Sequence, residues 1–273
     1  MKTVTIIFTC FNRKEKTTAF VRSVQDDRYD TRFVVTDDGS TDGTADELAK
    51  LKDEGFQIEM IRGDGKLYWC GGMRKAVAYI QKENIKSDYY VFANDDVVVF
   101  ENALHDMIIQ SEEHGKAVVA GATCDHAGSI TYGGIRYHKH GIKYDIVDVT
   151  SKDLTCDSFN CNLVLLPAEI FERIGNFDIH YTHAMGDFDY GLRIGRAGYR
   201  MESTGYFVGI CEKNPVAKTW SDRTLPRKER YRLKESVKGL PRKEWFYFLR
   251  KNFGLGTAVV RSVTPYVKIL LGK

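Results

Sequence analysis

Three polar residues, Asn94, Asp95 and Asp96, interrupt an otherwise apolar stretch of the chain. An apolar run at 91–93 precedes them, and a second run at 97–100 follows. A short apolar run is typical of a strand buried on both faces, so the two carboxylates stand where a strand ends. Carboxylate oxygens bind divalent cations, and open α/β sheets bind ligands at the carboxyl ends of their strands. The alternative is a turn in which the Asn and Asp side chains bond to the local backbone.

Three more polar clusters follow predicted strands in the first hundred residues. They are TCFNR, DDGS and GDG, at residues 9–13, 37–40 and 63–65. In a parallel sheet, the carboxyl ends of all these strands lie on one edge. One cluster there could be a turn, but four clusters indicate a binding crevice.

Strands and helices alternate through this part of the sequence. Strands are predicted at 3–8, 32–36, 58–61 and 91–93, and apolar residues at helical spacing predict helices at 14–24, from 44 onward and through 73–80. Thr44 and Glu47 fit a capping box at the start of the second helix. This alternation implies right-handed crossovers and a mainly parallel sheet flanked by helices, which is an α/β fold.

Charge is distributed unevenly along the 273 residues. The net charge is only +3, yet residues 222–273 carry 14 Lys and Arg against 4 Asp and Glu. A hydrophobic fraction of 43% and a charged fraction of 28% are ordinary for a globular protein and argue against disorder. The sequence therefore predicts an acidic body followed by a basic tail.

The cysteines and the apolar runs indicate a cellular compartment. The six cysteines show no CxxC pair, which argues against a zinc ribbon or a disulfide framework and favours reducing conditions. The apolar run at 4–8 is too short for a signal peptide, and no run approaches the roughly 20 residues that span a bilayer. We therefore predict a cytoplasmic protein.

Four segments together resemble family 2 glycosyltransferases of the GT-A fold. They are TIIFTCFNR at the amino terminus, VVTDDGSTDGT about thirty residues later, FANDD near residue 95 and GDFDYGLR near residue 190. Their joint order and spacing are far more specific than any one segment. The resemblance covers roughly residues 3–211 and implies a GT-A type, Rossmann-like fold. GDGKLYWCGGM and CEKNP resemble bacterial members that build surface polysaccharides, rhamnosyltransferase-like members included.

The resemblance implies a nucleotide-sugar donor and residues that bind its nucleotide. The positions that match are Thr9, Phe11, Asn12, Asp38 and Asp95. A carboxylate at position 38 can accept a hydrogen bond from a pyrimidine ring N–H, which an apolar side chain could not do. The implied donor is therefore a UDP-sugar or a dTDP-sugar.

The resemblance also implies a divalent cation, Mn²⁺ or Mg²⁺. Asp96 matches the last acid of the family's DXD motif, and Asn94 stands where the first acid often is. Cys211 falls where many members carry a metal-binding histidine, so a thiolate ligand is one interpretation and a buried small apolar residue is the other.

The second half of the sequence supplies the implied catalytic base. Aligned through the family's DxDxxxR spacing, Asp187 takes the position of the base that deprotonates the acceptor hydroxyl, and attack then inverts the anomeric carbon. The alternative for Asp187 is a helix cap. Asp189, in the first turn of that helix, and Trp69, which could stack on a sugar, are the predicted acceptor-binding residues.

The predicted organisation has three parts. Residues 1–122 form the nucleotide-sugar-binding half, 123–215 the acceptor-binding and catalytic half of the same GT-A domain, and 216–273 a basic helical extension. Basic residues beside aromatic and aliphatic ones suit a helix lying on anionic lipid, which predicts peripheral contact with the inner face of the cell membrane through 222–273 and a lipid-linked acceptor. The alternative is that these helices pack on the catalytic domain or on a second subunit. Packing on a second subunit would make the protein a homo-oligomer. No nucleic-acid recognition motif accompanies the charge.

The sequence thus predicts an inverting, metal-dependent glycosyltransferase acting on a glycan or lipid-linked acceptor in surface-polysaccharide synthesis. One alternative is a sugar nucleotidyltransferase, although TIIFTCFNRK lacks the glycines of that class's phosphate loop. The other is a catalytically silent subunit that binds nucleotide-sugar as a scaffold.

Overall fold

The computed structural model describes residues 1–139 and 141–273, so residue 140 of the predicted catalytic half lies outside the described residues. The strands are β1 (Thr3–Cys10), β2 (Asp30–Asp37), β3 (Gln57–Arg62), β4 (Tyr89–Ala93), β5 (Val98–Val99), β6 (Val118–Cys124), β7 (Ile130–Tyr132), β8 (Gly134–Tyr137), β9 (Tyr144–Ile146), β10 (Ser158–Phe159), β11 (Leu163–Pro167) and β12 (Met201–Ile210). The central sheet has the order β3-β2-β1-β4-β11-β6-β12-β5, and β7 pairs with β6.

The sheet is parallel in its first half and mixed in its second. Strands β1 to β4 are parallel, as the sequence predicts, whereas β11 runs antiparallel to both β4 and β6. Three short strands form a separate sheet in the order β10-β8-β9. The parallel half therefore brings the polar strand ends to one edge of the central sheet. The three-stranded sheet is separate from the central sheet.

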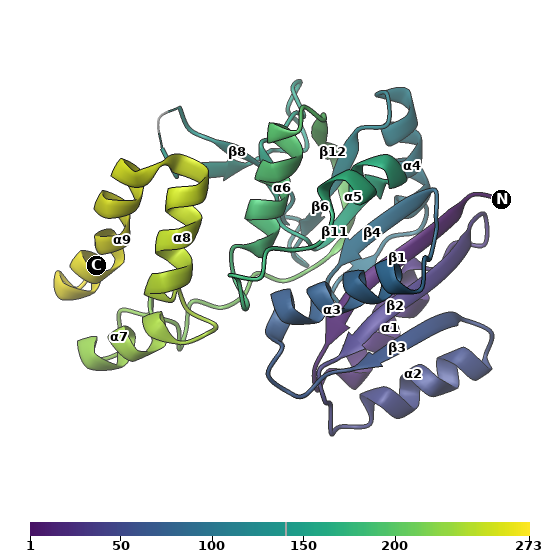
Figure 1. Cartoon of the computed structure of the whole chain (residues 1–273), viewed down its shortest axis with the longest axis horizontal. Helices are drawn as coiled ribbons and strands as arrows, with labels where there is room; N and C mark the ends of the chain where they lie inside the picture. Colours follow the sequence, from purple (N-terminus) through teal and green to yellow (C-terminus); the bar gives the residue numbers. More distant parts are fainter. Residues whose placement is uncertain (140) are drawn as a thin grey trace.

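Helices cover both faces of the central sheet (Figure 1). They are α1 (Lys14–Val24), α2 (Thr44–Asp53), α3 (Tyr68–Lys82), α4 (Ala103–Glu113), α5 (Ala168–Ile174), α6 (Gly186–Arg196), α7 (Arg227–Glu235), α8 (Arg242–Phe253) and α9 (Leu255–Leu270). Apolar side chains of α1, α2 and α4 pack on one face, and those of α3, α5 and α6 pack on the other.

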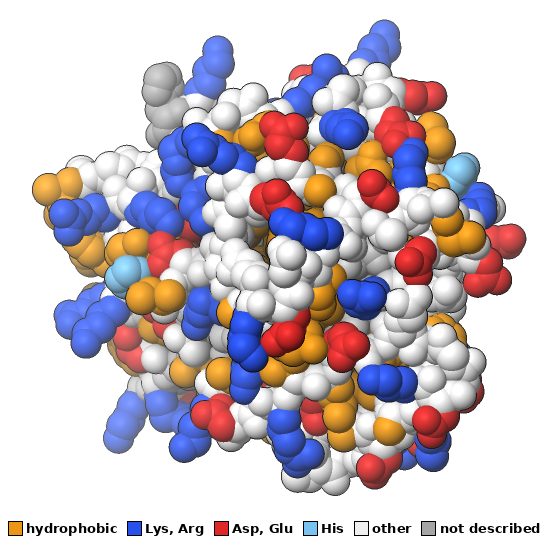
Figure 2. All heavy atoms as spheres, turned by 45° about the vertical axis from the view of Figure 1, so that its right-hand side comes forward, with side chains coloured by type: hydrophobic (Ala, Val, Ile, Leu, Met, Phe, Trp, Pro, Cys, Tyr) orange, Lys and Arg blue, Asp and Glu red, His pale blue; other side chains and the backbone are white. Residues whose placement is uncertain are grey.

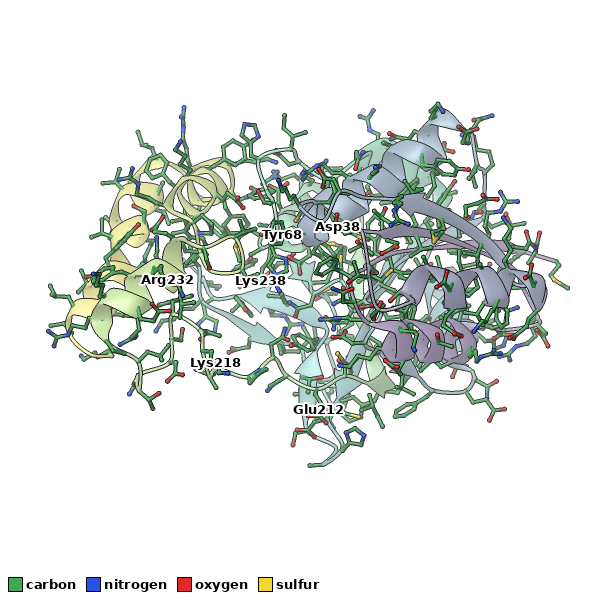
Figure 3. All side chains as sticks on the ribbon, turned by 90° about the horizontal axis from the view of Figure 1, so that it is seen from below. Asp38, Tyr68, Glu212, Lys218, Arg232 and Lys238 are labelled. Carbon is green, nitrogen blue, oxygen red and sulfur yellow. The ribbon has the colours of Figure 1, made fainter. Side chains whose placement is uncertain are left out.

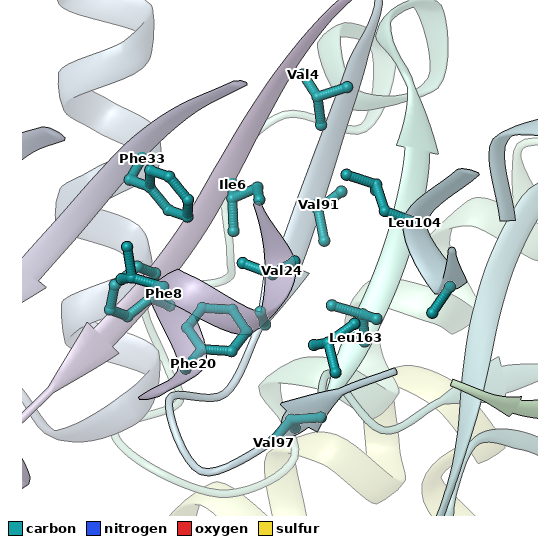
Figure 4. Close-up of a cluster of buried hydrophobic side chains, with 14 of the residues drawn as sticks. Val4, Ile6, Phe8, Phe20, Val24, Phe33, Val91, Val97, Leu104 and Leu163 are labelled. Atoms are coloured by element: carbon teal, nitrogen blue, oxygen red, sulfur yellow. The ribbon is translucent and has the colours of Figure 1, made fainter. Parts of the chain in front are cut away.

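Strand β1 shows why the sequence folds this way. Val4, Ile6 and Phe8 point to one face, where Phe20 and other side chains of α1 cover them (Figure 4). Ile7 points to the opposite face and joins the core under α3. Alternation of apolar side chains to two buried faces is what fixes a central strand.

Helix α2 begins differently from the predicted capping box. The residue before the helix is Gly43, whose φ of 89° is left-handed, and Thr44 Oγ1 donates to Asp42 Oδ1. Glu47 pairs with Lys50 at 2.7 Å instead of reaching back. The predicted capping box was wrong because Asp42, which lies before the Thr44–Glu47 pattern, accepts the hydrogen bond of the Thr44 hydroxyl.

The basic extension is helical, as predicted, and α7, α8 and α9 form it at one end of the molecule (Figure 1). Figure 2 shows Lys and Arg side chains concentrated on the left-hand side of the view, where the extension lies. Within the described part of the chain, every helix is too short or too polar to cross a bilayer.

Candidate active site

Asp38 holds the loop between β3 and α3. Its carboxylate accepts hydrogen bonds from the backbone N–H groups of Gly65 at 2.9 Å and of Leu67 and Tyr68 at 3.0 Å. A carboxylate has about four lone-pair positions, so one acceptor position remains. Asp38 can therefore accept one further N–H at the sheet edge, beside Tyr68 (Figure 3).

Thr9 and Phe11 lie at the carboxyl end of β1 in different environments. Thr9 Oγ1 donates to the carbonyl oxygen of Thr36 at 3.0 Å, so this hydroxyl joins β1 to β2. Helix α3 comes so close here that a Cβ on Gly72 would overlap the Thr9 side chain. The Phe11 ring is 48% exposed and is free to stack on a planar group.

Asn12 shapes the loop beside them. Its φ is 52°, in the left-handed region that Asn tolerates better than most residues. Its N–H donates to Ser40 Oγ at 2.9 Å, and its Oδ1 accepts from the N–H of Thr41 at 2.8 Å. Asn12 thus joins the loop after β1 to the loop after β2.

The two acids after β4 have different roles in the structure. Asp95 is 3% exposed, and its carboxylate accepts from Arg13 Nη1 at 3.0 Å and Thr17 Oγ1 at 2.9 Å. Burial raises the pKa of Asp95, while Arg13 and Thr17 oppose that rise. Arg13 also contacts Asp96 Oδ2 at 2.9 Å. A buried carboxylate with these partners orients Arg13, so direct contact of Asp95 with a nucleotide stays a prediction.

Asp96 is the acid of this pair that can contact a ligand, because its side chain is 21% exposed. Cys211 Sγ lies 3.8 Å from Asp96 Oδ1, so the two predicted metal ligands are neighbours. However, Cys211 is buried and accepts from Asn162 Nδ2 at 3.2 Å, and burial, then the Asp96 charge, raises the pKa of its thiol to about 12. Asn94 Oδ1 accepts a hydrogen bond from Trp69 Nε1 at 2.8 Å, so this oxygen already has a partner within the protein.

Asp187 lies at the start of α6, after Met185, whose left-handed backbone has a φ of 70°. Its Oδ1 accepts from the N–H of the next residue, Phe188, at 2.9 Å, and its side chain does not cap the helix. Burial raises the pKa of Asp187 to about 6, although hydrogen bonds from Phe188, Cys161 and Asn160 oppose the rise. A carboxyl group with this pKa changes protonation easily near neutral pH.

Asp189 is fully buried, with 0% exposure. Its carboxylate accepts from Lys251 Nζ at 2.8 Å, Asn252 Nδ2 at 3.1 Å and the Tyr181 hydroxyl at 3.2 Å. Lys251 Nζ also bonds to Asp178 Oδ2 at 2.7 Å. An acceptor hydroxyl could not reach this carboxylate, so we assign Asp189 to the attachment of α8 to α6, in place of the predicted acceptor contact.

Trp69 begins α3 close to both acidic pairs. Besides its bond to Asn94, its ring packs edge to face on Phe177, with the centroids 5.4 Å apart. The backbone N–H of the next residue, Cys70, donates to the carbonyl of Thr182 at 3.1 Å, which ties this helix start to the loop before Asp187. Trp69 is partly exposed there, so contact with an acceptor stays a prediction.

Arg13, His183 and Lys238 are functional candidates that the sequence reasoning did not select. His183 lies beside Tyr68, with ring centroids 6.2 Å apart. Burial, then the charges of Lys238 and Arg13, lowers the pKa of His183 to about 4, so its imidazole is neutral. Figure 3 shows Lys238 on the side of the extension that faces Tyr68 and Asp38. Arg13 ends the polar cluster after β1 and could have been found there, but no pattern in the sequence relates Lys238 to that cluster.

Three solved structures share the fold of this chain at low sequence identity. The mannosyltransferase PcManGT from Pyrobaculum calidifontis, in complex with GDP-Man and Mn²⁺, has a TM-score of 0.60 at 15% identity, over 97% of this chain and 74% of that one. GalNAc-T7 with UDP, GalNAc and Mn²⁺ has a TM-score of 0.59 at 11% identity, over 92% of this chain and 56% of that one. TarS residues 1–349 from S. aureus has a TM-score of 0.56 at 12% identity, over 98% and 81%.

The sequence comparisons identify the family. Curated protein sequences give no match. The family model described as glycosyl transferase family 2 matches residues 5–168, from β1 through β11 to the start of α5. This match covers more than half of the chain and includes the polar ends of β1, β2 and β4. The chain therefore belongs to glycosyl transferase family 2 and is a glycosyltransferase of the GT-A fold.

Proposed function

We propose that this glycosyltransferase transfers a sugar from a pyrimidine nucleoside diphosphate to a glycan hydroxyl, with inversion at the anomeric carbon. The observation that carries the proposal is the environment of Asp187, where burial raises the carboxyl pKa to about 6. A general base works best when its pKa lies near the operating pH. Its neighbour Asp189 cannot take this role because it is buried and bound to Lys251.

In the proposed reaction, Asp187 accepts the proton of the attacking hydroxyl while the new bond from oxygen to the anomeric carbon forms. The bond between that carbon and the diphosphate oxygen breaks on the opposite side, and the nucleoside diphosphate leaves with the electron pair. Attack opposite the leaving group inverts the configuration. Asp187 then releases the proton to water.

We propose Asp96 as the protein's ligand for Mn²⁺ or Mg²⁺. Its partly exposed carboxylate lies beside the end of β4, and PcManGT and GalNAc-T7 were solved with Mn²⁺. The described residues contain no group of three His, Cys, Asp or Glu side chains that could hold a metal. Diphosphate and water oxygens would therefore complete the coordination, as is usual for Mg²⁺. The cation would offset the negative charge that develops on the diphosphate.

The donor nucleotide is proposed to lie at the ends of β1 and β2. Phe11 offers an exposed ring for stacking on the base, and Asp38 keeps one acceptor position for a base N–H. Thr9 and Asn12 support this position through bonds to the backbone of β2 and its following loop. This arrangement favours uracil or thymine, whose ring N–H can donate to a carboxylate.

The proposed acceptor is a lipid-linked glycan of a bacterial surface polysaccharide, used at the cytoplasmic face of the membrane. Helix α9 and the residue after it support membrane contact because they expose seven apolar side chains, each between 46% and 66%: Leu255, Val259, Val260, Val263, Val267, Leu270 and Leu271. Arg261, Lys268 and Lys273 lie in the same segment. Apolar and basic side chains together suit an anionic lipid surface. A second copy of the chain on α9 would instead make a homo-oligomer, which light scattering distinguishes from binding to phosphatidylglycerol vesicles.

Thermal stabilisation tests the donor site, because a ligand that binds only the folded state raises the melting temperature. We expect UDP-sugars or dTDP-sugars to stabilise the protein when Mn²⁺ is present and much less without it. Asp96→Ala should abolish the Mn²⁺ dependence, whereas Asp53→Ala, an exposed acid at the far end of α2, should keep it. Stabilisation by GDP-sugars alone would contradict the pyrimidine proposal. Donor binding without any sugar transfer by the wild-type protein would support a scaffold subunit.

A further inference from the structure

The β8–β9 hairpin carries a pair of tyrosines beside the proposed base. Tyr137 and Tyr144 are direct cross-strand partners, so their rings project from the same face of the hairpin. Their ring centroids are 5.9 Å apart. The Tyr144 ring packs at 5.3 Å from Phe188, which follows Asp187 in the chain, and the Tyr137 ring packs at 5.2 Å from Phe253 at the end of α8.

The two tyrosines leave unused binding capacity at this position. The Tyr144 side chain is 43% exposed, although one edge rests on Phe188. The Tyr137 hydroxyl is buried and has no hydrogen-bond partner within residues 1–139 and 141–273. A buried hydroxyl without a partner is unfavourable, so a ligand that bonds to it removes that penalty.

Several observations place Asp187 next to these rings. Phe188 donates its N–H to Asp187 Oδ1, and the same Phe188 supports Tyr144. Asn160, whose side chain bonds to Asp187, donates its backbone N–H to Gly133, immediately before β8. In addition to burial, the Asp187 charge raises the pKa of both Tyr137 and Tyr144. Trp69 and Tyr137 also pack against the same apolar cluster, which includes Phe188.

We propose that Tyr144 and Tyr137 form the subsite for the accepting sugar, with Asp187 at its inner end. The inference rests on the proposed glycosyl transfer and specifies where its acceptor binds. A pyranose ring has an apolar C–H face that packs on an exposed aromatic ring, and hydroxyls around its rim that bond to polar groups. The sugar's C–H face covers Tyr144, one hydroxyl bonds to Tyr137, and a neighbouring hydroxyl reaches Asp187. The proposed position of the donor base is at the end of β1, on residues other than these two tyrosines.

The test measures acceptor and donor kinetics separately. The donor is the nucleotide-sugar that stabilises the wild-type protein with Mn²⁺, and the acceptors are a panel of p-nitrophenyl glycosides. We expect Tyr144→Ala to raise the acceptor KM by about tenfold, because an aromatic contact is lost. Tyr137→Phe, which keeps the ring packing on Phe253, should raise it several-fold. Both variants should keep the donor KM and the Mn²⁺-dependent stabilisation of wild type.

Tyr79→Ala is the matched control, because Tyr79 is a partly exposed tyrosine on α3 whose hydroxyl faces Glu59 of β3. Its acceptor KM should equal that of wild type. An unchanged acceptor KM in both hairpin variants would overturn the subsite, as would failure of wild type to use any glycoside of the panel. Failure of every nucleotide-sugar to stabilise wild type is a different result, since it removes the proposed function itself.

Discussion

In both the acidic pair after β4 and the acidic pair at the start of α6, one carboxylate bonds to a cationic side chain. The two pairs differ in whether that cation also bonds to the second acid of the pair. In each pair one carboxylate is buried against a cation, Asp95 against Arg13 and Asp189 against Lys251, and the other acid carries the proposed chemistry. Arg13 extends to the second acid, Asp96, at 2.9 Å. Lys251 bonds instead to Asp178, away from Asp187.

This difference matches the two proposed roles. A metal ligand must present carboxylate oxygens, and the Asp96 side chain stays 21% exposed while it contacts Arg13. A general base must bind a proton readily, and burial without a paired cation raises the pKa of Asp187 to about 6. The placement of Arg13 and Lys251 therefore separates the proposed roles of the two acidic pairs.

Exchanging the two acids of α6 for amides should give the largest and most distinct effects. Asp187→Asn should lower kcat by about 10²–10⁴-fold, because a general base typically contributes that much. It should keep Mn²⁺-dependent donor stabilisation. Asp189→Asn, the matched control two residues away, should keep the base chemistry but lower the melting temperature, because it leaves Lys251 with one partner fewer. An Asp187→Asn enzyme with wild-type turnover would remove the assignment of the base.

Lys251→Met should destabilise the protein by about 2 kcal/mol, because the fully buried Asp189 carboxylate loses a charge-assisted hydrogen bond and keeps only Arg193 Nε, 3.3 Å away, as a cation. The free energy of unfolding in urea measures this effect. The double variant Lys251→Met, Asp189→Asn should recover part of the loss, since no buried charge then remains unpaired. Lys243→Met, earlier on the same helix and exposed, is the control and should change the free energy of unfolding little. Equal losses in the two Lys→Met variants would show that Lys251 has no special role in holding Asp189.

The sequence predicts the elements of the first half well because their signals are local. Residues 14–24 carry apolar side chains at helical spacing and form α1 with the predicted bounds. The apolar strands place their polar ends at one edge, which brings the predicted donor residues together. The separate roles of Asp187 and Asp189 could not be predicted in this way. They depend on Lys251, which lies 62 residues from Asp189 in the chain and meets it only after the extension folds back.

The raised pKa of Asp187 predicts how activity and stability depend on pH. Below about pH 6 the carboxyl group is protonated, so kcat/KM should fall about tenfold per pH unit and level off above that value. The folded state binds this proton more tightly than the unfolded state. The Asp187 contribution to the free energy of unfolding should therefore fall as pH rises from about 4 to about 6. Asp187→Asn should remove this fall, and a pH–rate profile without a break near pH 6 would contradict the assignment.

Cys211→Ala should have the smallest effect, although Cys211 Sγ lies 3.8 Å from Asp96 Oδ1. Its thiol is buried and its pKa is raised to about 12, and a thiolate is a poor match for Mg²⁺ and Mn²⁺, which prefer oxygen ligands. We therefore expect the Mn²⁺ concentration needed for half-maximal donor stabilisation to stay within about threefold of wild type. Asp96→Ala, which removes the proposed oxygen ligand at the same position, should abolish that dependence. If Cys211→Ala instead needs tenfold more Mn²⁺, the metal must lower the thiol pKa enough to bind a thiolate, and Asp96 then acts with a second protein ligand from the end of β12.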